Sequence, residues 1–123
     1  VERLSAAGIR VSLFIDPDIE QLDAAREVRA PVVEWHTGTY ADAGGDQQVQ
    51  ELQRLHRACE HGHARGLQIN AGHGLHLENV QDVTRLPHMT ELNIGHSIIA
   101  RAIFVGLDQA VKEMKQLIQS ASA

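Results

Sequence analysis

The stretch "LQINAGHGL" (residues 67–75) decides the fold of this chain, because an apolar run passes through an Asn into a Gly-His pair. The same order returns in "ELNIGHSII" (residues 91–99). Each stretch reads as a short β-strand followed directly by the start of a helix. A strand-to-helix turn that occurs twice predicts parallel strands joined by helical crossovers.

Working outward, four apolar runs predict strands, and they are Arg10–Ile15, Pro31–His36, Leu67–Gly72 and Glu91–His96. Apolar residues three or four positions apart predict helices after each strand. These stripes are Ile19/Leu22/Ala25/Val28, Val49/Leu52/Leu55/Cys59, Leu77/Val80/Val83/Leu86 and Leu107/Val111/Met114/Ile118. The resulting β-α-β-α-β-α-β-α order fits an open doubly wound sheet or part of a (β/α)8 barrel. In both architectures the chemistry lies beyond the carboxyl ends of the strands.

Helix boundaries have their own signals. The Asp16-Pro17-Asp18 cluster predicts a cap for the first helix, Asp46 is expected to cap the second, and Pro87 stops the third. The segment "TGTYADAGGDQQ" (residues 37–48) has no apolar pattern and contains two adjacent glycines. We expect a mobile functional loop there, such as an active-site lid.

Composition limits the classes of function. The chain has 123 residues, enough for one domain, and a net charge of −5 with no basic cluster, which argues against nucleic acid as a partner. No apolar run is long enough for a membrane span, and no signal peptide pattern opens the chain. The single cysteine, Cys59, excludes an internal disulfide. We therefore expect a cytoplasmic domain, and the helix-like opening "VERLSAAG" suggests a fragment of a longer protein.

The Gly-His pairs indicate an anion site. Glycine lets the backbone approach a ligand closely, and the start of the next helix points unpaired N–H groups at the same place. Gly95-His96 leads directly into Ser97, so amides at this helix start are candidate donors to a phosphate. The alternative is an ordinary turn that needs glycine, with the histidine only capping the helix.

Glu34 is the candidate carboxylate. It lies in an apolar strand and by alternation shares a face with Val32 and His36, while Trp35 points the other way. Desolvation on that face would raise its pKa. A structural ion pair at the strand end is the alternative.

Histidines also raise the question of a metal. Three of them, His36, His73 and His96, lie at strand ends, and a second group is His56, His61 and His63. The strand-end set has no HxH or HxxxH spacing, so a metal is not favoured there. The second group is interpreted as a solvated helix end. Cys59 is expected in the core, and Arg101 either reaches a phosphate or pairs with a surface acid.

Four motifs together carry a resemblance. "VSLFID", "EWHTGTYAD", "NAGHGL" and "ELNIGHSII", in this order and spacing, resemble pyridoxine 5′-phosphate synthase of the deoxyxylulose-dependent vitamin B6 pathway. The resemblance implies an α/β (β/α)8 TIM barrel of about 250 residues. Residues 1–123 would then be the carboxyl-terminal half of one barrel domain, contributing four βα units with parallel strands.

The resemblance also implies an activity. Members of this family are transferases that condense 3-amino-2-oxopropyl phosphate with 1-deoxy-D-xylulose 5-phosphate, giving pyridoxine 5′-phosphate, inorganic phosphate and water. It implies no metal and no organic cofactor. The implied partners are phosphorylated small molecules and further copies of the same chain, typically in an octamer, with no nucleic acid and no membrane.

Residue roles follow from the same resemblance. His73 matches the proton-donor histidine, and Glu34 matches the glutamate that stabilises the transition state. Three positions match those that bind the substrate phosphate, and they are Gly74, Gly95 and His96. The other two acid/base residues of the family lie in the half that these residues do not include, so the chain alone is expected to be inactive.

Two other readings stay open. One is a non-catalytic half-barrel that binds phosphate, and the other is a different phosphate-handling barrel enzyme. The only lysines, Lys112 and Lys115, fall in the last helical segment, which disfavours an enzyme with a Schiff-base lysine at a strand end.

Overall fold

Four parallel strands form one sheet in the computed structural model, which describes residues 1–121. The strands are β1 (Ser12–Ile15), β2 (Val32–His36), β3 (Gln68–Gly72) and β4 (Met89–Asn93). Their spatial order is β1-β2-β3-β4, and every neighbouring pair is parallel. A doubly wound sheet reverses its strand order at a switch point, whereas a barrel does not. The predicted α/β fold is confirmed, and the arrangement is that of half a (β/α)8 barrel.

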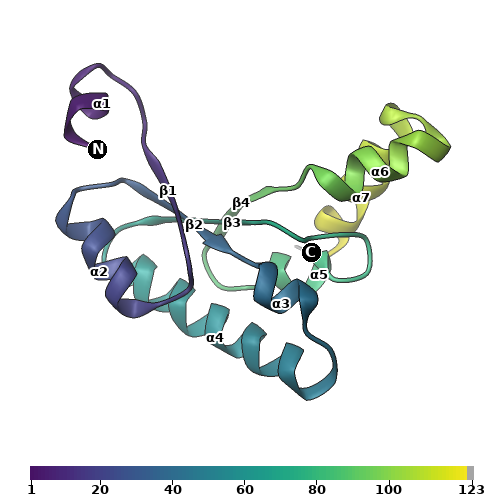
Figure 1. Cartoon of the computed structure of the whole chain (residues 1–123), viewed down its shortest axis with the longest axis horizontal. Coiled ribbons are helices and arrows are strands. Elements are labelled where there is room, and N and C mark those ends of the chain that lie inside the picture. The colour runs from purple at the N-terminus through teal and green to yellow at the C-terminus, as the bar shows by residue number, and fades with distance from the viewer. Residues whose placement is uncertain (122–123) are drawn as a thin grey trace.

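Helices precede, connect and follow the strands (Figure 1). They are α1 (Glu2–Ala6), α2 (Ile19–Glu27), α3 (Gly38–Asp42), α4 (Gly45–Ala64), α5 (Val80–Thr84), α6 (His96–Val105) and α7 (Leu107–Ala121). Helices α2 and α4 run beneath β1, β2 and β3, while α6 and α7 pack on each other beyond the end of β4. Asp18 caps α2 as predicted, because its carboxylate accepts the amides of Glu20 and Gln21.

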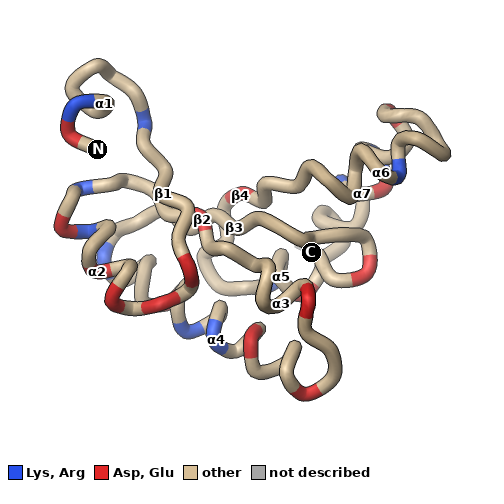
Figure 2. The backbone as a smooth tube through the Cα atoms, in the orientation of Figure 1, with Lys and Arg blue, Asp and Glu red and all other residues tan. Residues whose placement is uncertain are grey.

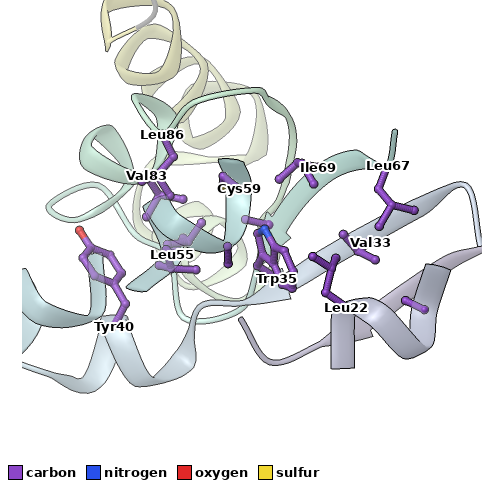
Figure 3. Packing of buried hydrophobic residues seen from close by; sticks show 14 residues of the cluster. Leu22, Val33, Trp35, Tyr40, Leu55, Cys59, Leu67, Ile69, Val83 and Leu86 are labelled. Carbon is purple, nitrogen blue, oxygen red and sulfur yellow. The ribbon is translucent and has the colours of Figure 1, made fainter. Parts of the chain in front are cut away.

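The core lies between the sheet and these helices (Figure 3). Trp35 of β2 is fully buried there with Leu55 and Cys59 of α4. Gly62 lets α4 approach the sheet closely, because a Cβ atom there would come 2.6 Å from Ile69 Cδ1. Cys59 is therefore a core residue, as predicted.

The opposite face of the sheet carries a different set of side chains. Register places Phe14 beside Glu34, Glu34 beside Asn70, and Asn70 beside Glu91 across the four strands. Phe14 is 55% exposed although it is a large apolar residue. In a closed barrel this face is the interior.

Several predicted boundaries were wrong. Residues 37–48 are mostly helical rather than a loop, because α3 occupies Gly38–Asp42 and α4 already begins at Gly45. The N-cap of α4 is Gly44, and Asp46 lies inside the first turn without a capping bond. Glycine is among the residues that occupy N-cap positions, and Gly44 has the extended backbone that such a position requires.

Other boundaries moved by a few residues. The third predicted helix is short, limited to Val80–Thr84. Strand β4 ends at Asn93, and His96 begins α6 instead of ending the strand. The final segment holds two helices, since Gly106 with φ +86° separates α6 from α7. In the described residues, no helix combines the length and the apolarity that crossing a bilayer requires.

The core contact of α4 yields a stability prediction. Leu55→Ala removes a side chain that is 1% exposed, so the free energy of unfolding should fall by about 2–5 kcal/mol. Val49→Ala on the same helix is the control, because Val49 is 55% exposed and its loss should change stability by about 0.5 kcal/mol or less. Urea denaturation followed by circular dichroism measures both. Equal losses for the two variants would contradict this assignment of the buried face.

Candidate functional site

One pocket of about 590 Å³ opens beyond the carboxyl ends of β2, β3 and β4. All five predicted site residues line it, namely Glu34, His73, Gly74, Gly95 and His96. The other lining residues are Phe14, Asp42, Leu75, His76, Asn93, Ile94 and Ser97. The structure therefore brings together residues from strand β2 and from the turns that follow β3 and β4.

The turn after β3 holds His73 in an unusual backbone conformation. His73 has φ +83° and Gly74 has φ +75°, so two consecutive residues are left-handed. Such a conformation costs a non-glycine residue free energy and must be held by its surroundings. Gly74 also needs its missing side chain, because a Cβ atom would lie 2.6 Å from Ala41 Cβ.

Thr37 is the residue that holds this turn. Its side chain is completely buried, and its hydroxyl lies 2.7 Å from the carbonyl oxygen of Gly72 and 2.6 Å from that of His73. Its amide donates a further bond of 2.9 Å to Gly72 O. The residue after β2 thus ties down the residues that end β3, and it sets the direction in which His73 leaves the sheet.

The His73 imidazole has aromatic neighbours. Its ring centroid lies 4.7 Å from that of His36 and 6.5 Å from that of Phe14. His36 in turn places Nδ1 3.4 Å from Asp16 Oδ1. Gly38 leaves room for both histidines, since a Cβ atom there would be 2.7 Å from His36 Cε1. A smaller pocket of about 320 Å³ adjoins the first one here and shares His73 with it.

Glu34 lines the main pocket from strand β2. Asn93 Nδ2 donates a hydrogen bond of 2.8 Å to Glu34 Oε2. Gly72 keeps space for the other oxygen, because a Cβ atom there would be 2.5 Å from Glu34 Oε1. Burial raises the pKa of Glu34, the Asn93 bond opposes this rise, and the charge of Glu91 adds to it. No described residue forms an ion pair with Glu34, which argues against a structural salt bridge there.

The start of α6 forms one side of the pocket. Gly95 is the N-cap, and the first backbone bond of the helix joins Ile99 N to Gly95 O at 3.0 Å. The amides before Ile99 therefore have no carbonyl partner within the helix. Ser97 Oγ donates a bond of 2.6 Å to Leu75 O, which fixes the helix start to the turn that carries His73.

The charges around the pocket are mostly negative. Its lining has the carboxylates of Glu34 and Asp42 and, within residues 1–121, no lysine or arginine. Figure 2 shows that the basic residues lie elsewhere along the chain. Arg101, whose role the sequence left open, pairs with Glu113 at 2.8 and 3.2 Å. An anion in this pocket would thus depend on amides and histidines of this chain.

The histidines of the described residues are dispersed rather than gathered in one group. Among the described residues, no group of three or more His, Cys, Asp or Glu side chains has a geometry that could hold a metal ion. His61 lies 3.8 Å from Asp23, and His63 stacks on His88 with ring centroids 3.6 Å apart.

Sequence reasoning missed some of the site. Asp42 lines both pockets, but it lies in a segment that has no apolar pattern. His76 also lines the main pocket, three positions after His73. Asp42 closes the quoted motif EWHTGTYAD, whereas the only signal for His76 was its position shortly after a strand end. Thr37 was part of a quoted motif, yet its tie to the next strand depends on tertiary structure.

Known proteins resemble this chain over nearly its whole length. The family model of the pyridoxal phosphate biosynthesis protein PdxJ matches residues 1–120. The chain belongs to the PdxJ family. Its sequence is 58% identical over 120 residues to the pyridoxine 5′-phosphate synthase of Idiomarina loihiensis and 56% identical over 122 residues to that of Magnetococcus marinus. These alignments cover 97% and 98% of this chain.

The chain is also 48% identical over 121 residues to the pyridoxine 5′-phosphate synthase of Akkermansia muciniphila, and this alignment covers 98% of the chain. The chain spans about half the length of these curated relatives, 50%, 50% and 49%. Membership in the PdxJ family agrees with the resemblance found in the four motifs, and the half-length coverage agrees with the half-barrel sheet.

The Thr37 tie generates a first prediction for the PdxJ-family site. Thr37→Val keeps the shape but removes the hydroxyl, whose single hydrogen is shared between the carbonyl oxygens of Gly72 and His73, so the free energy of unfolding should fall by about 1–3 kcal/mol. Thr37→Ser keeps the hydroxyl and should recover most of that loss. Urea denaturation of the three proteins is the measurement, and a Thr37→Val variant as stable as the parent would refute the tie.

The raised pKa of Glu34 generates a second prediction. The folded protein holds this proton more tightly than the unfolded chain does, so ionisation of Glu34 costs folding free energy. That cost is absent well below the ordinary value of 4.5 and is complete above the raised pKa of the folded state. Glu34→Gln should therefore be more stable than the parent at pH 7, and this advantage should disappear as the pH falls below 4.5.

Thermal unfolding between about pH 3 and pH 8 measures the effect. Glu27→Gln is the matched control, because it removes one exposed negative charge at the end of α2 from a residue that does not line the pocket. A Glu34→Gln protein that is less stable than the parent at pH 7 would contradict the assignment.

Proposed function

We propose that this chain is the carboxyl-terminal half of a pyridoxine 5′-phosphate synthase. The complete enzyme would condense 3-amino-2-oxopropyl phosphate with 1-deoxy-D-xylulose 5-phosphate, giving pyridoxine 5′-phosphate, phosphate and water. Membership in the PdxJ family supports the class of reaction, and the names of the curated relatives support the product.

The observation that carries the proposal is the shared pocket. Glu34, His73 and His96 come from three different strand ends and still line one cavity. A ring-closing condensation needs a proton donor, a group that stabilises positive charge and a holder for phosphate, and the pocket has one group for each.

In this proposal His73 is the general acid. Its side chain is exposed to the pocket and its backbone is held by Thr37, so the imidazole is positioned before substrate arrives. A histidine can donate a proton near neutral pH, as the loss of a hydroxyl group as water requires. Glu34 faces the same space and would stabilise iminium-like cations through its negative charge.

The substrate phosphate would bind at the start of α6. Gly95 exposes the free amides of the first turn, His96 adds a side-chain donor, and Gly74 offers its amide from the opposite turn. Because Glu34 and Asp42 already make the lining negative, we propose that further cationic groups come from the amino-terminal half of the barrel.

The division of the barrel into two halves explains why this chain alone would be inactive. Strands β1 and β4 each have one neighbour, so each leaves an edge without a partner among the described residues. The complete barrel would close these edges and supply the missing acid/base residues. Assembly into a homo-oligomer in the cytoplasm, without metal or organic cofactor, completes the proposal.

A non-catalytic half-barrel that binds phosphate is the second candidate. The free amides of α6 favour it, because they need no other half to bind an anion. Inorganic phosphate binding without turnover, measured on the assembled protein, would distinguish it from the synthase.

A complementation experiment tests the proposal. This chain is mixed with a separately made amino-terminal half from the family, and pyridoxine phosphate and free phosphate are followed with and without chelator. Product should form in both conditions, and His73→Ala should lower the rate by roughly 10²–10⁴-fold because the general acid is lost. His56→Ala, which changes an exposed histidine of α4, is the control and should keep the parent rate.

The halves must first be shown to associate by sedimentation and to be folded by circular dichroism. If folded and associated halves give no product, the synthase proposal is wrong and the phosphate-binding half-barrel remains.

A further inference from the structure

The face of the sheet that is opposite the helices carries a continuous line of hydrogen-bonded side chains. Arg10 donates to Gln68 Oε1, and Gln68 Nε2 donates to Asn70 Oδ1 at 2.9 Å. Asn70 Nδ2 then donates to Glu91 Oε1 at 3.2 Å. The line ends at the pocket, where Asn93 contacts both Glu91 and Glu34.

Asn93 occupies the decisive position in this line. Its Nδ2 donates at 2.8 Å to Glu34 Oε2 and at 3.2 Å to Glu91 Oε1, so one amide group lies between two carboxylates. Both hydrogens of that amide can be used at once, one for each acceptor. Two carboxylates this close would otherwise repel each other, and one of them would tend to take up a proton.

The geometry also restricts where the Glu34 carboxylate can lie. On one side the space left by Gly72 receives Oε1, and on the other side Oε2 meets the Asn93 amide. Asn93 is the last polar residue before Gly95 in the chain, so its strand also leads directly into the proposed phosphate site. The orientation of Glu34 and the start of α6 are therefore set by the same strand end.

We propose that Asn93 is a positioning residue that fixes the orientation of the Glu34 carboxylate and keeps it charged. The negative charge of Glu91, on the same strand as Asn93, acts against the ionisation of Glu34. This inference rests on the proposed function only for its catalytic consequence, since the contacts themselves belong to the fold. It gives Glu91 a role as well, as a second charge that adjusts how readily Glu34 binds a proton.

The titratable groups near Glu34 come from every neighbouring element. They are Asp42 on α3, His73 and His76 after β3 and His96 at the start of α6, which line the same pocket, together with Glu91 on β4. Of these, the charge of Glu91 raises the pKa of Glu34, whereas the Asn93 hydrogen bond lowers it. Removing the two residues should therefore have opposite effects.

The experiment measures the protonation of Glu34 directly, in a full-length PdxJ-family protein that includes residues 1–123. Glutamate is labelled with ¹³C at the carboxyl carbon, and the Glu34 signal is identified by its loss in Glu34→Gln. Asn93→Ala should move the titration midpoint of that signal to higher pH, and Glu91→Gln should move it to lower pH. Asn70→Ala is the matched control, because Asn70 is the same residue type on the adjacent strand and donates to Glu91 but not to Glu34.

Activity gives the catalytic readout. For Asn93→Ala, kcat/KM at pH 7 should fall roughly 10- to 100-fold through kcat, as the loss of a hydrogen bond to a charged group predicts. The acid limb of its pH profile should move in the same direction as the midpoint. A residue that only supports the fold would lower the amount of active protein without moving either quantity.

The outcomes separate the two proposals. A Glu34 midpoint that stays in place in Asn93→Ala, or that moves in the same direction in Glu91→Gln, overturns the inference about Asn93. If the unmodified protein forms no pyridoxine phosphate while the midpoints move as stated, the proposed function is wrong and the inference about Asn93 stands.

Discussion

Alternation along parallel strands is the constraint on which the rest of the structure depends. Each strand has one side packed on helices and one side facing away from them, so neighbouring residues have opposite surroundings. In β2 this separates Trp35, which is fully buried in the core, from Glu34, which lies at the pocket. A shift of register by one residue would exchange the two and destroy both the core and the site.

The site is built by contacts between successive strand ends rather than within one connection. Thr37 after β2 holds the turn after β3, and Ser97 at the start of α6 holds Leu75 in that same turn. Asn93 at the end of β4 returns to Glu34 on β2. Each element therefore depends on a neighbour that is distant in sequence, and the His73 backbone keeps its left-handed conformation because these neighbours surround it.

Periodicity was sufficient to predict the strands, their parallel direction and the rim on which the site lies, but not their order in the sheet. The helices were harder to place, because the α3 segment has glycines and polar residues instead of an apolar stripe. Val49 was expected on the buried side of α4 but is 55% exposed, since the helix turns its contact surface toward Leu55 and Cys59. The partner of Arg101 could not be predicted either, because Glu113 reaches it only once α6 and α7 have packed together.

The burial of the single cysteine has a consequence for covalent labelling. Cys59 has no exposed surface, and burial raises its pKa to about 12, against a smaller opposing effect of the Trp35 N–H. At neutral pH the sulfur is therefore a protonated thiol without access to solvent, and thiol reagents attack the thiolate. Modification at this position must wait until α4 separates from the sheet, so its rate reports how often the central layer of the protein opens.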